Sequence, residues 1–184
     1  MALTPHLPGT ARYTRPAVLL HLLLALMILG SFSVGVYMSD LPVSPTRLKL
    51  YSWHKWAGVT ILALSALRLL WRLGHRPPPD VPMPAWQARA AHLTHGLFYL
   101  LFFAVPLVGW AYSSAAGFPV VWFGVLPLPD FVPVHKPLAE ILKAVHGNLA
   151  FALAGLVLLH VAGAVKHQVI DRDGLIRRMG WGAR

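Results

Sequence analysis

Long apolar stretches dominate the chain and predict four membrane-spanning helices. A helix needs about 20 mostly apolar residues to cross the roughly 30 Å hydrocarbon core of a bilayer. Four ranges reach this length, at about 16–38, 52–73, 92–112 and 144–169. Whole turns of these ranges lack polar residues, whereas the helices of a soluble bundle carry a polar stripe at helical spacing. We therefore expect an all-α membrane protein, a four-transmembrane-helix bundle that forms one domain over residues 1–184.

The connections between these ranges differ in composition. Residues 117–137 are rich in proline but also in Val, Trp, Phe and Leu, which argues against both a fifth spanning helix and a solvated linker. We expect them to form an outer, periplasmic cap in the membrane interface. Residues 76–84 are proline-rich and predict a stiff, extended linker. The first apolar range is longer than the apolar region of a signal peptide and is expected to stay attached.

The distribution of Lys and Arg residues predicts which ends of the helices face the cytoplasm. The chain is 57% hydrophobic and 12% charged, with a net charge of +10. Such a charge could suit a nucleic-acid-binding protein, but eleven of the sixteen Lys and Arg residues lie near the N-terminus, the second connection and the C-terminus. By the positive-inside rule, both termini and the second connection face the cytoplasm. We therefore expect no nucleic-acid partner.

The absence of cysteine from the sequence limits the chemistry. It excludes disulfides, iron–sulfur clusters, cysteine-based zinc sites and the covalent attachment of c-type haem. Any haem would be held non-covalently, as haem b is.

Four histidines fall at matched depths in the expected helices. His146 and His160 are fourteen residues apart, which corresponds to about 21 Å of rise on nearly the same helix face. His21 shares the inner depth with His160, and His54 shares the outer depth with His146. Neutral imidazole binds iron well, and burying it without a partner costs roughly 2–7 kcal/mol. The pattern predicts two bis-histidine haems, although a single histidine in an apolar helix is more often a structural group or a proton relay.

Five segments carry a family resemblance: VLLHLL at His21, SWHKWAG at His54, AHLTHGLFYLLFFAVPLVGW, KAVHGNLA at His146, and GLVLLHVAGAVKHQ at His160. In this order and spacing the chain resembles the bacterial cytochrome b561 family over nearly its whole length. The related cytochrome b subunit of nickel–iron hydrogenases has a similar core. Leu22 is a departure, since a Trp is common there. The resemblance implies two b haems ligated by the pairs named above, in a multi-pass protein of the bacterial cytoplasmic (inner) membrane.

The resemblance also implies an oxidoreductase that exchanges electrons with a ubiquinone pool. For the four-helix branch it suggests oxidation of superoxide at the outer face and reduction of quinone. Five basic residues against three acidic ones on the outer side would attract a small anion. One alternative is a haem b relay or anchor subunit that passes electrons from a partner dehydrogenase or hydrogenase to quinone. Another is a non-haem, proton-coupled transporter.

Three basic residues are further candidates. Arg68 follows His54 by fourteen residues, so we expect it at the inner haem, where its planar fork suits a propionate. Arg72 either shares this role or extends to the interface. Lys55 adjoins His54 but points about 100° away, toward solvent or an incoming anion. It is the one candidate for a catalytic role.

The remaining histidines carry weaker signals. His92 and His95 share a face at the start of the third range, and they either exchange protons with a quinone headgroup or form a helix-end hydrogen-bonding pair. His167 lies two turns beyond His160, where it would contact a haem propionate or lipid headgroups. Three further histidines fall in expected loops and suggest no role: His6, His75 and His135.

Overall fold

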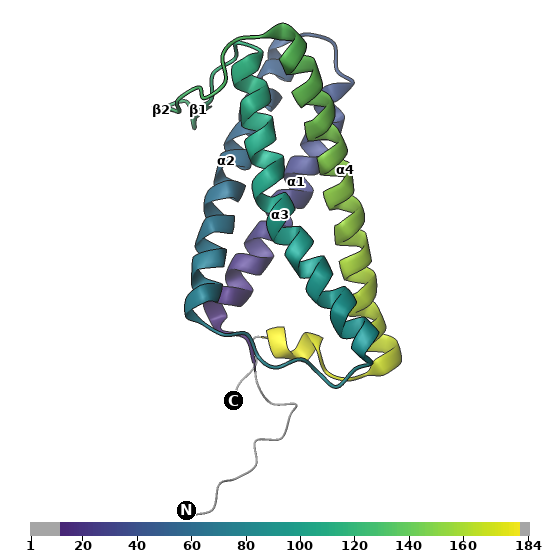
Figure 1. Ribbon diagram of the computed structural model, residues 1–184. Helices are drawn as coiled ribbons and strands as arrows, with labels where there is room; N and C mark the ends of the chain where they lie inside the picture. Colours follow the sequence, from purple (N-terminus) through teal and green to yellow (C-terminus); the bar gives the residue numbers. More distant parts are fainter. Residues whose placement is uncertain (1–11, 181–184) are drawn as a thin grey trace, which may run out of the picture.

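The computed structural model describes residues 12–180, which form a bundle of four long helices (Figure 1). These are α1 (Arg15–Ser39), α2 (Pro45–Gly74), α3 (Ala85–Ala115) and α4 (Lys136–Lys166). Each is long and apolar enough to cross a membrane. The predicted all-α membrane fold with four spanning helices is confirmed. His6 lies outside the described residues.

Three helices begin earlier than their apolar ranges indicate. α2 starts at Pro45 and not near 52, α3 at Ala85 and not near 92, and α4 at Lys136 and not near 144. The added turns contain charged and polar residues, which a criterion based on apolar length leaves out. Helical hydrogen bonding continues through these turns because a helix satisfies its own backbone in lipid and in water alike.

Side-chain caps and prolines fix two of these early starts. The Ser44 hydroxyl accepts a hydrogen bond from the Arg47 amide at 3.2 Å, and Pro45 follows in the first turn of α2. His135 caps α4 in the same way, since its Nδ1 accepts from the Leu138 amide at 3.2 Å. Such caps satisfy amides that lack helical partners, and proline suits the first turn because it has no amide hydrogen to lose.

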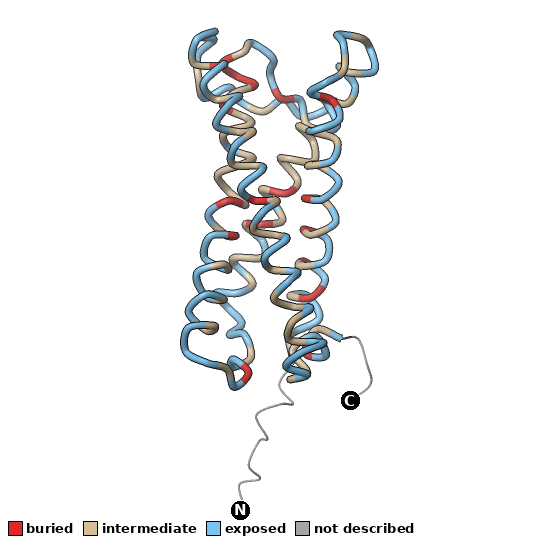
Figure 2. Tube along the Cα trace, turned by 90° about the vertical axis from the view of Figure 1, so that its right-hand side faces the viewer, coloured by how far each residue is buried: buried red, intermediate tan, exposed pale blue. Residues whose placement is uncertain are grey.

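The helices pack in sequence order, with α1 along α2, α2 against α3, and α3 along α4. The start of α1 and the C-terminal segment lie at one end of the bundle, and the α3–α4 connection lies at the other (Figure 1). We call the first the inner end and the second the outer end. Large apolar side chains point outward along the helices, for example Leu26 at 69% and Leu158 at 72% exposure. Much of the chain trace along the helices is exposed (Figure 2). An apolar surface of this extent is suited to lipid.

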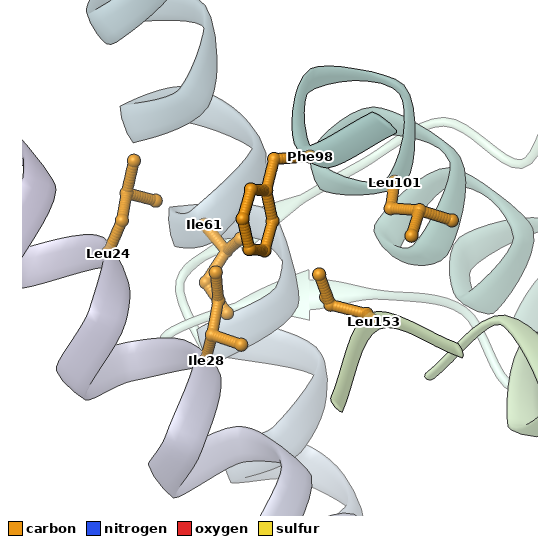
Figure 3. Packing of buried hydrophobic residues seen from close by; sticks show 6 residues of the cluster. All are labelled: Leu24, Ile28, Ile61, Phe98, Leu101 and Leu153. Carbon is orange, nitrogen blue, oxygen red and sulfur yellow. The ribbon is translucent and has the colours of Figure 1, made fainter. Parts of the chain in front are cut away.

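A small cluster of buried side chains fills the middle of the bundle (Figure 3). All four helices contribute to it. It lies between the two histidine depths, since Leu153 is seven residues from both His146 and His160. The cluster comprises Leu24, Ile28, Ile61, Phe98, Leu101 and Leu153.

The α3–α4 connection, predicted as an interfacial cap, contains a short hairpin. Strand β1 (Val121–Trp122) pairs antiparallel with β2 (Leu126–Pro127). The turn between them contains Gly124 at φ +73°, a conformation that glycine adopts without strain. Trp56 Nε1 donates to the Val121 carbonyl at 2.7 Å, which ties the hairpin to α2. The connection is therefore a structured cap over the outer end of α2.

The C-terminal segment links several parts of the chain at the inner end of the bundle. α4 continues into a π-helical turn (His167–Asp171), and a 3₁₀ helix (Ile176–Met179) follows. Arg178 is 4% exposed, and its Nη2 donates to the Pro79 carbonyl at 2.7 Å. The Arg178 carbonyl accepts from the Tyr13 amide at 3.1 Å. One residue thus connects the start of the chain, the α2–α3 connection and the end of α4.

Replacing Arg178 with Ala should loosen the inner end. The substitution removes the charged donor to the Pro79 carbonyl, and a hydrogen bond to a charged group contributes about 1.5–3 kcal/mol. We expect a lower Tm in detergent and faster proteolysis after residue 171. Arg177→Ala is the matched control because Arg177 is exposed in the same 3₁₀ helix. Equal effects of the two substitutions would contradict the role given to Arg178.

Candidate functional site

The outer end holds the pair predicted from the sequence, His54 on α2 and His146 on α4. Their ring centres are 6.0 Å apart and their planes are perpendicular, at 90°. His54 Nδ1 donates to the Ser31 carbonyl at 3.0 Å, and His146 Nδ1 donates to the Val105 carbonyl at 3.0 Å. A carbonyl only accepts, so each Nδ1 carries the hydrogen. Nε2 of each ring is then unprotonated and available to a metal.

Two glycines let neighbouring helices approach these rings. A Cβ atom at Gly109 on α3 would lie 2.8 Å from Cε1 of His146, which is closer than real side-chain contacts allow. A Cβ at Gly35 on α1 would lie 3.1 Å from Cε1 of His54. The absent side chains therefore make room for the imidazoles and for their hydrogen bonds to Ser31 and Val105.

A cavity of about 240 Å³ adjoins the outer pair. Side chains from all four helices line it, and His54 and His146 are among them. Apart from these two rings and Ser31, the lining residues are apolar or glycine. A mostly apolar cavity with a few convergent polar groups is typical of a cofactor site.

The inner end brings His21 on α1 and His160 on α4 together. Their ring centres are also 6.0 Å apart, with an interplanar angle of 71°. His95 on α3 lies just as near, 5.8 Å from the His160 ring, and Phe98 packs against His160 at 5.4 Å. Within residues 12–180, no hydrogen bond is found for the rings of these three histidines. The inner site therefore contains two candidate partners for His160.

The spacing of both pairs fits a metal held between two imidazoles. A metal–imidazole bond is about 2.0–2.1 Å long for zinc, and a ring nitrogen lies about 1.1 Å from the ring centre. Two imidazoles on opposite sides of one metal then have ring centres roughly 6.3 Å apart. Both observed separations are 6.0 Å. The donor set at each depth, two neutral nitrogens without a thiolate or carboxylate, suits haem iron.

Arg68 lies at the inner depth, as its spacing from His54 predicts. It is half-buried and lies within electrostatic reach of His21, His95 and His160. Arg72 is exposed, with its guanidinium 5.8 Å from the centre of the Tyr99 ring. This exposed position fits an Arg72 side chain that extends to the membrane interface better than one that binds a propionate inside the bundle.

His92 and His95, near the start of α3, make contacts in different directions. His95 faces His160, whereas His92 Nε2 bonds to Asp80 Oδ2 at 2.8 Å on the surface. The side chains of His92 and Asp80 are 65% and 57% exposed, so this ion pair contributes little to stability. Asp80 lies in the connection for which the sequence suggests no chemistry.

His167 lies in a cluster of ionisable groups at the end of α4. Its Nδ1 is 2.5 Å from Asp173 Oδ2 and 3.3 Å from Asp171 Oδ2. Lys166 Nζ also contacts Asp171 Oδ2, at 2.5 Å. The His167 side chain is 14% exposed and faces these carboxylates.

Lys55 is bound to the cap. Its Nζ donates to the Phe118 carbonyl at 2.9 Å and lies 6.0 Å from the centre of the Phe118 ring. The side chain is half-buried, and the prediction that it meets solvent or an incoming anion stays a prediction. The contact spans 63 residues of sequence, and helical spacing alone could not reveal it.

Arg47 lies at the outer end of the bundle, and the sequence suggested no role for it beyond its share of the outer positive charge. It lies in the first turn of α2, and its Nη2 donates to the Tyr51 hydroxyl at 3.3 Å. Its Nε atom is buried and has no hydrogen-bond partner in the described part of the chain. The available signal was its spacing, because Arg47 precedes His54 by seven residues, which is two helical turns on the same face.

Comparisons with known proteins agree with this architecture. A family model described as prokaryotic cytochrome b561 matches residues 12–182. "Cytochrome b561 homolog 2" of Escherichia coli is 32% identical over 173 residues, covering 91% of this chain and 90% of the relative. "Probable superoxide oxidase CybB" of Yersinia pestis is 34% identical over 127 residues, covering 68% of this chain and 72% of the relative. "Cytochrome b561 homolog 1" of Escherichia coli is 28% identical over 172 residues, covering 91% and 96%.

Replacing Gly109 with Ala should displace the His146 ring. The added Cβ would lie 2.8 Å from Cε1 and 2.9 Å from Nδ1, so the hydrogen bond to Val105 is lost or distorted. Overpacking of this kind costs about 1–3 kcal/mol, and the Tm in detergent should fall.

Gly96→Ala is the matched control on the same helix. No atom lies within 4 Å of a Cβ built at Gly96, and alanine favours a helix over glycine by roughly 0.5–1 kcal/mol. The control should therefore keep or raise the Tm. A Gly109→Ala protein as stable as the control would show that the close approach to His146 does not matter.

Proposed function

We propose a transmembrane di-haem electron-transfer function for this chain, which belongs to the prokaryotic cytochrome b561 family. The protein is a multi-pass protein of the bacterial inner membrane, and its family binds b-type haem and transfers electrons as oxidoreductases. The proposal is that electrons pass from a periplasmic donor to the quinone pool. The main support for this proposal is the presence of two histidine pairs at opposite ends of the bundle, each with ring centres 6.0 Å apart.

In this proposal His54 and His146 hold an outer haem b, and His21 and His160 hold an inner one. Haem b, when bound, supplies one-electron transfer at each depth. The carbonyls of Ser31 and Val105 fix the outer rings through Nδ1 and direct Nε2 toward the metal position. At the inner depth Arg68 supplies a positive charge for a haem carboxylate.

His21 is proposed as the inner ligand rather than His95, because the His21–His160 separation equals that of the outer pair. His95 then lies beside the inner pair without an iron to bind. From there its ring nitrogens would exchange protons with a bound quinone, general acid–base work that imidazole commonly performs. His167 and its carboxylates, at the inner end of α4, would connect that position to the cytoplasm. His92 is held on the surface by Asp80 and takes no direct part.

The donor proposed is superoxide and the acceptor ubiquinone. Two superoxide ions each lose one electron and leave as two molecules of oxygen. One quinone takes up the two electrons and two protons and leaves as quinol. Support comes from the Yersinia pestis relative named as a superoxide oxidase and from the surplus of basic residues on the outer side. Lys55 uses one ammonium hydrogen on Phe118 and keeps others for an anion.

The termini are proposed to be cytoplasmic. The inner end of the bundle collects the start of α1, the α2–α3 connection with the adjoining turns of α2 and α3, and the C-terminal segment with the end of α4. Ten of the sixteen Lys and Arg residues lie in these described parts. This orientation places Lys55, the hairpin and the outer histidine pair toward the periplasm.

Single histidine substitutions test the assignment of ligands. His54→Ala and His146→Ala should each remove one haem of two, and His21→Ala and His160→Ala should each remove the other. The measurement is haem per protein by pyridine haemochrome assay, with low-temperature spectra to distinguish the two haems. His95→Ala is the matched control and should keep both haems. Loss of the inner haem in His95→Ala but not in His21→Ala would reverse the assignment.

Rapid mixing of the purified protein with superoxide tests the donor and acceptor. We expect fast appearance of the reduced haem band, followed by its decay and by quinol formation when oxidised ubiquinone is present. Haems that ignore superoxide but are reduced by quinol or by a partner dehydrogenase would identify a relay subunit. A purified protein without any haem would favour the proton-coupled transporter and contradict both electron-transfer functions.

A further inference from the structure

We propose that Arg47, with Tyr51 and Tyr112, forms a binding site for an anionic oxygen group two helical turns outside the outer histidine pair. The group assigned to it is a propionate of the outer haem. This inference rests on the proposed function, because it requires a haem between His54 and His146. It adds an outer counterpart to Arg68, which lies at the inner depth.

The position of Arg47 relative to His54 is the first argument. Seven residues of helix α2 separate them, which corresponds to about 10.5 Å of rise and a rotation only some 20° short of two full turns. Arg47 therefore lies above His54 on the same face of α2, toward the outer end. A carboxylate on the edge of a haem ligated by His54 would extend along this face.

The unsatisfied guanidinium is the second argument. Nη2 of Arg47 donates to the Tyr51 hydroxyl at 3.3 Å, and the guanidinium lies 5.5 Å from the centre of the Tyr51 ring. Nε is sealed from solvent and has no hydrogen-bond partner among residues 12–180. Within residues 12–180, no Asp or Glu oxygen lies within 4 Å of Arg47. A buried N–H donor without an acceptor costs free energy, and a carboxylate placed beside Nε would satisfy it.

The neighbours of Arg47 suit an oxygen ligand. Tyr112, at the end of α3, lies within electrostatic reach of Arg47, Tyr51 and Glu140. Two phenol hydroxyls and a planar guanidinium fork, supplied by α2 and α3, offer the donors that a carboxylate accepts. Glu140 is exposed at the start of α4 and makes no ion pair with Arg47.

Two sources could supply such a group, a haem propionate or a free anion from the periplasm. The buried Nε atom favours the propionate, because a resident carboxylate reaches it from inside the bundle, whereas a free anion would have to displace the covering side chains. Lys55 lies on another face of α2 and is bound to the cap, so the two basic residues do not form one site.

Redox titration of the purified holoprotein tests the site. A positive charge beside a haem carboxylate favours the reduced haem, so Arg47→Gln should lower the potential of the outer haem. The outer haem is identified as the component that His146→Ala removes. We expect the ratio of reduced to oxidised outer haem at fixed ambient potential to fall about tenfold, equal to about 59 mV for one electron. The inner component should not move.

Two further variants separate charge from geometry. Lys49→Gln removes the same charge from an exposed residue two positions along α2, where Lys49 lies over the Trp53 ring, and it should shift neither component. Arg47→Lys keeps the charge but loses the planar fork, so it should give an intermediate shift together with weaker retention of the outer haem on dilution.

Each outcome decides between the alternatives. An Arg47→Gln shift confined to the outer component supports the propionate. An unchanged potential combined with slower, salt-sensitive reduction by superoxide overturns the propionate assignment and gives the site to a free anion. A protein in which Arg47→Gln and Lys49→Gln behave alike in both measurements overturns the site itself. Fewer than two haems in the unmodified protein would instead contradict the proposed function.

Discussion

Hydrogen bonds between histidine side chains and the backbone of neighbouring helices organise the outer half of this protein. His54 and His146 donate through Nδ1 to carbonyls on α1 and α3, so each imidazole is held by a helix other than its own. In hydrocarbon an unsatisfied polar nitrogen is expensive, and a carbonyl already used in a helix can accept a second hydrogen bond. The glycine at 109 follows from this constraint, because a Cβ there would lie 2.8 Å from the His146 ring, and Gly35 leaves a similarly tight space of 3.1 Å beside the His54 ring.

The inner half lacks such anchors. Three imidazoles and Phe98 gather around His160, and no carbonyl holds any of the three rings within the described chain. A rigid outer pair and a looser inner group suit different tasks. Under the proposed function, an electron entry point would gain from fixed ligand geometry, whereas a site that exchanges protons with a mobile quinone would need groups that can change partners. The cluster of Leu24, Phe98 and Leu153 keeps the two regions apart and dry.

The sequence predicted the four spanning helices and the depths of the paired histidines because both depend on helical periodicity and apolar length, which are local properties. It did not predict the hydrogen bonds from Lys55 to Phe118 and from Trp56 to Val121, since these join residues more than 60 positions apart. The sequence also did not predict that His92 and His95 contact different parts of the protein. They share a helix face, yet Asp80 from a loop draws one outward while the packing of α4 leaves the other facing inward.

α4 carries a histidine of each pair on one unbroken helix from Lys136 to Lys166. The separation of His146 and His160 along α4 and the angle between them are therefore set by the helix pitch and not by how the bundle is assembled. One inserted residue between them would turn the second ring by about 100°. Connections can lengthen or shorten freely around such a helix, but the fourteen-residue interval within it can change only by near-whole turns.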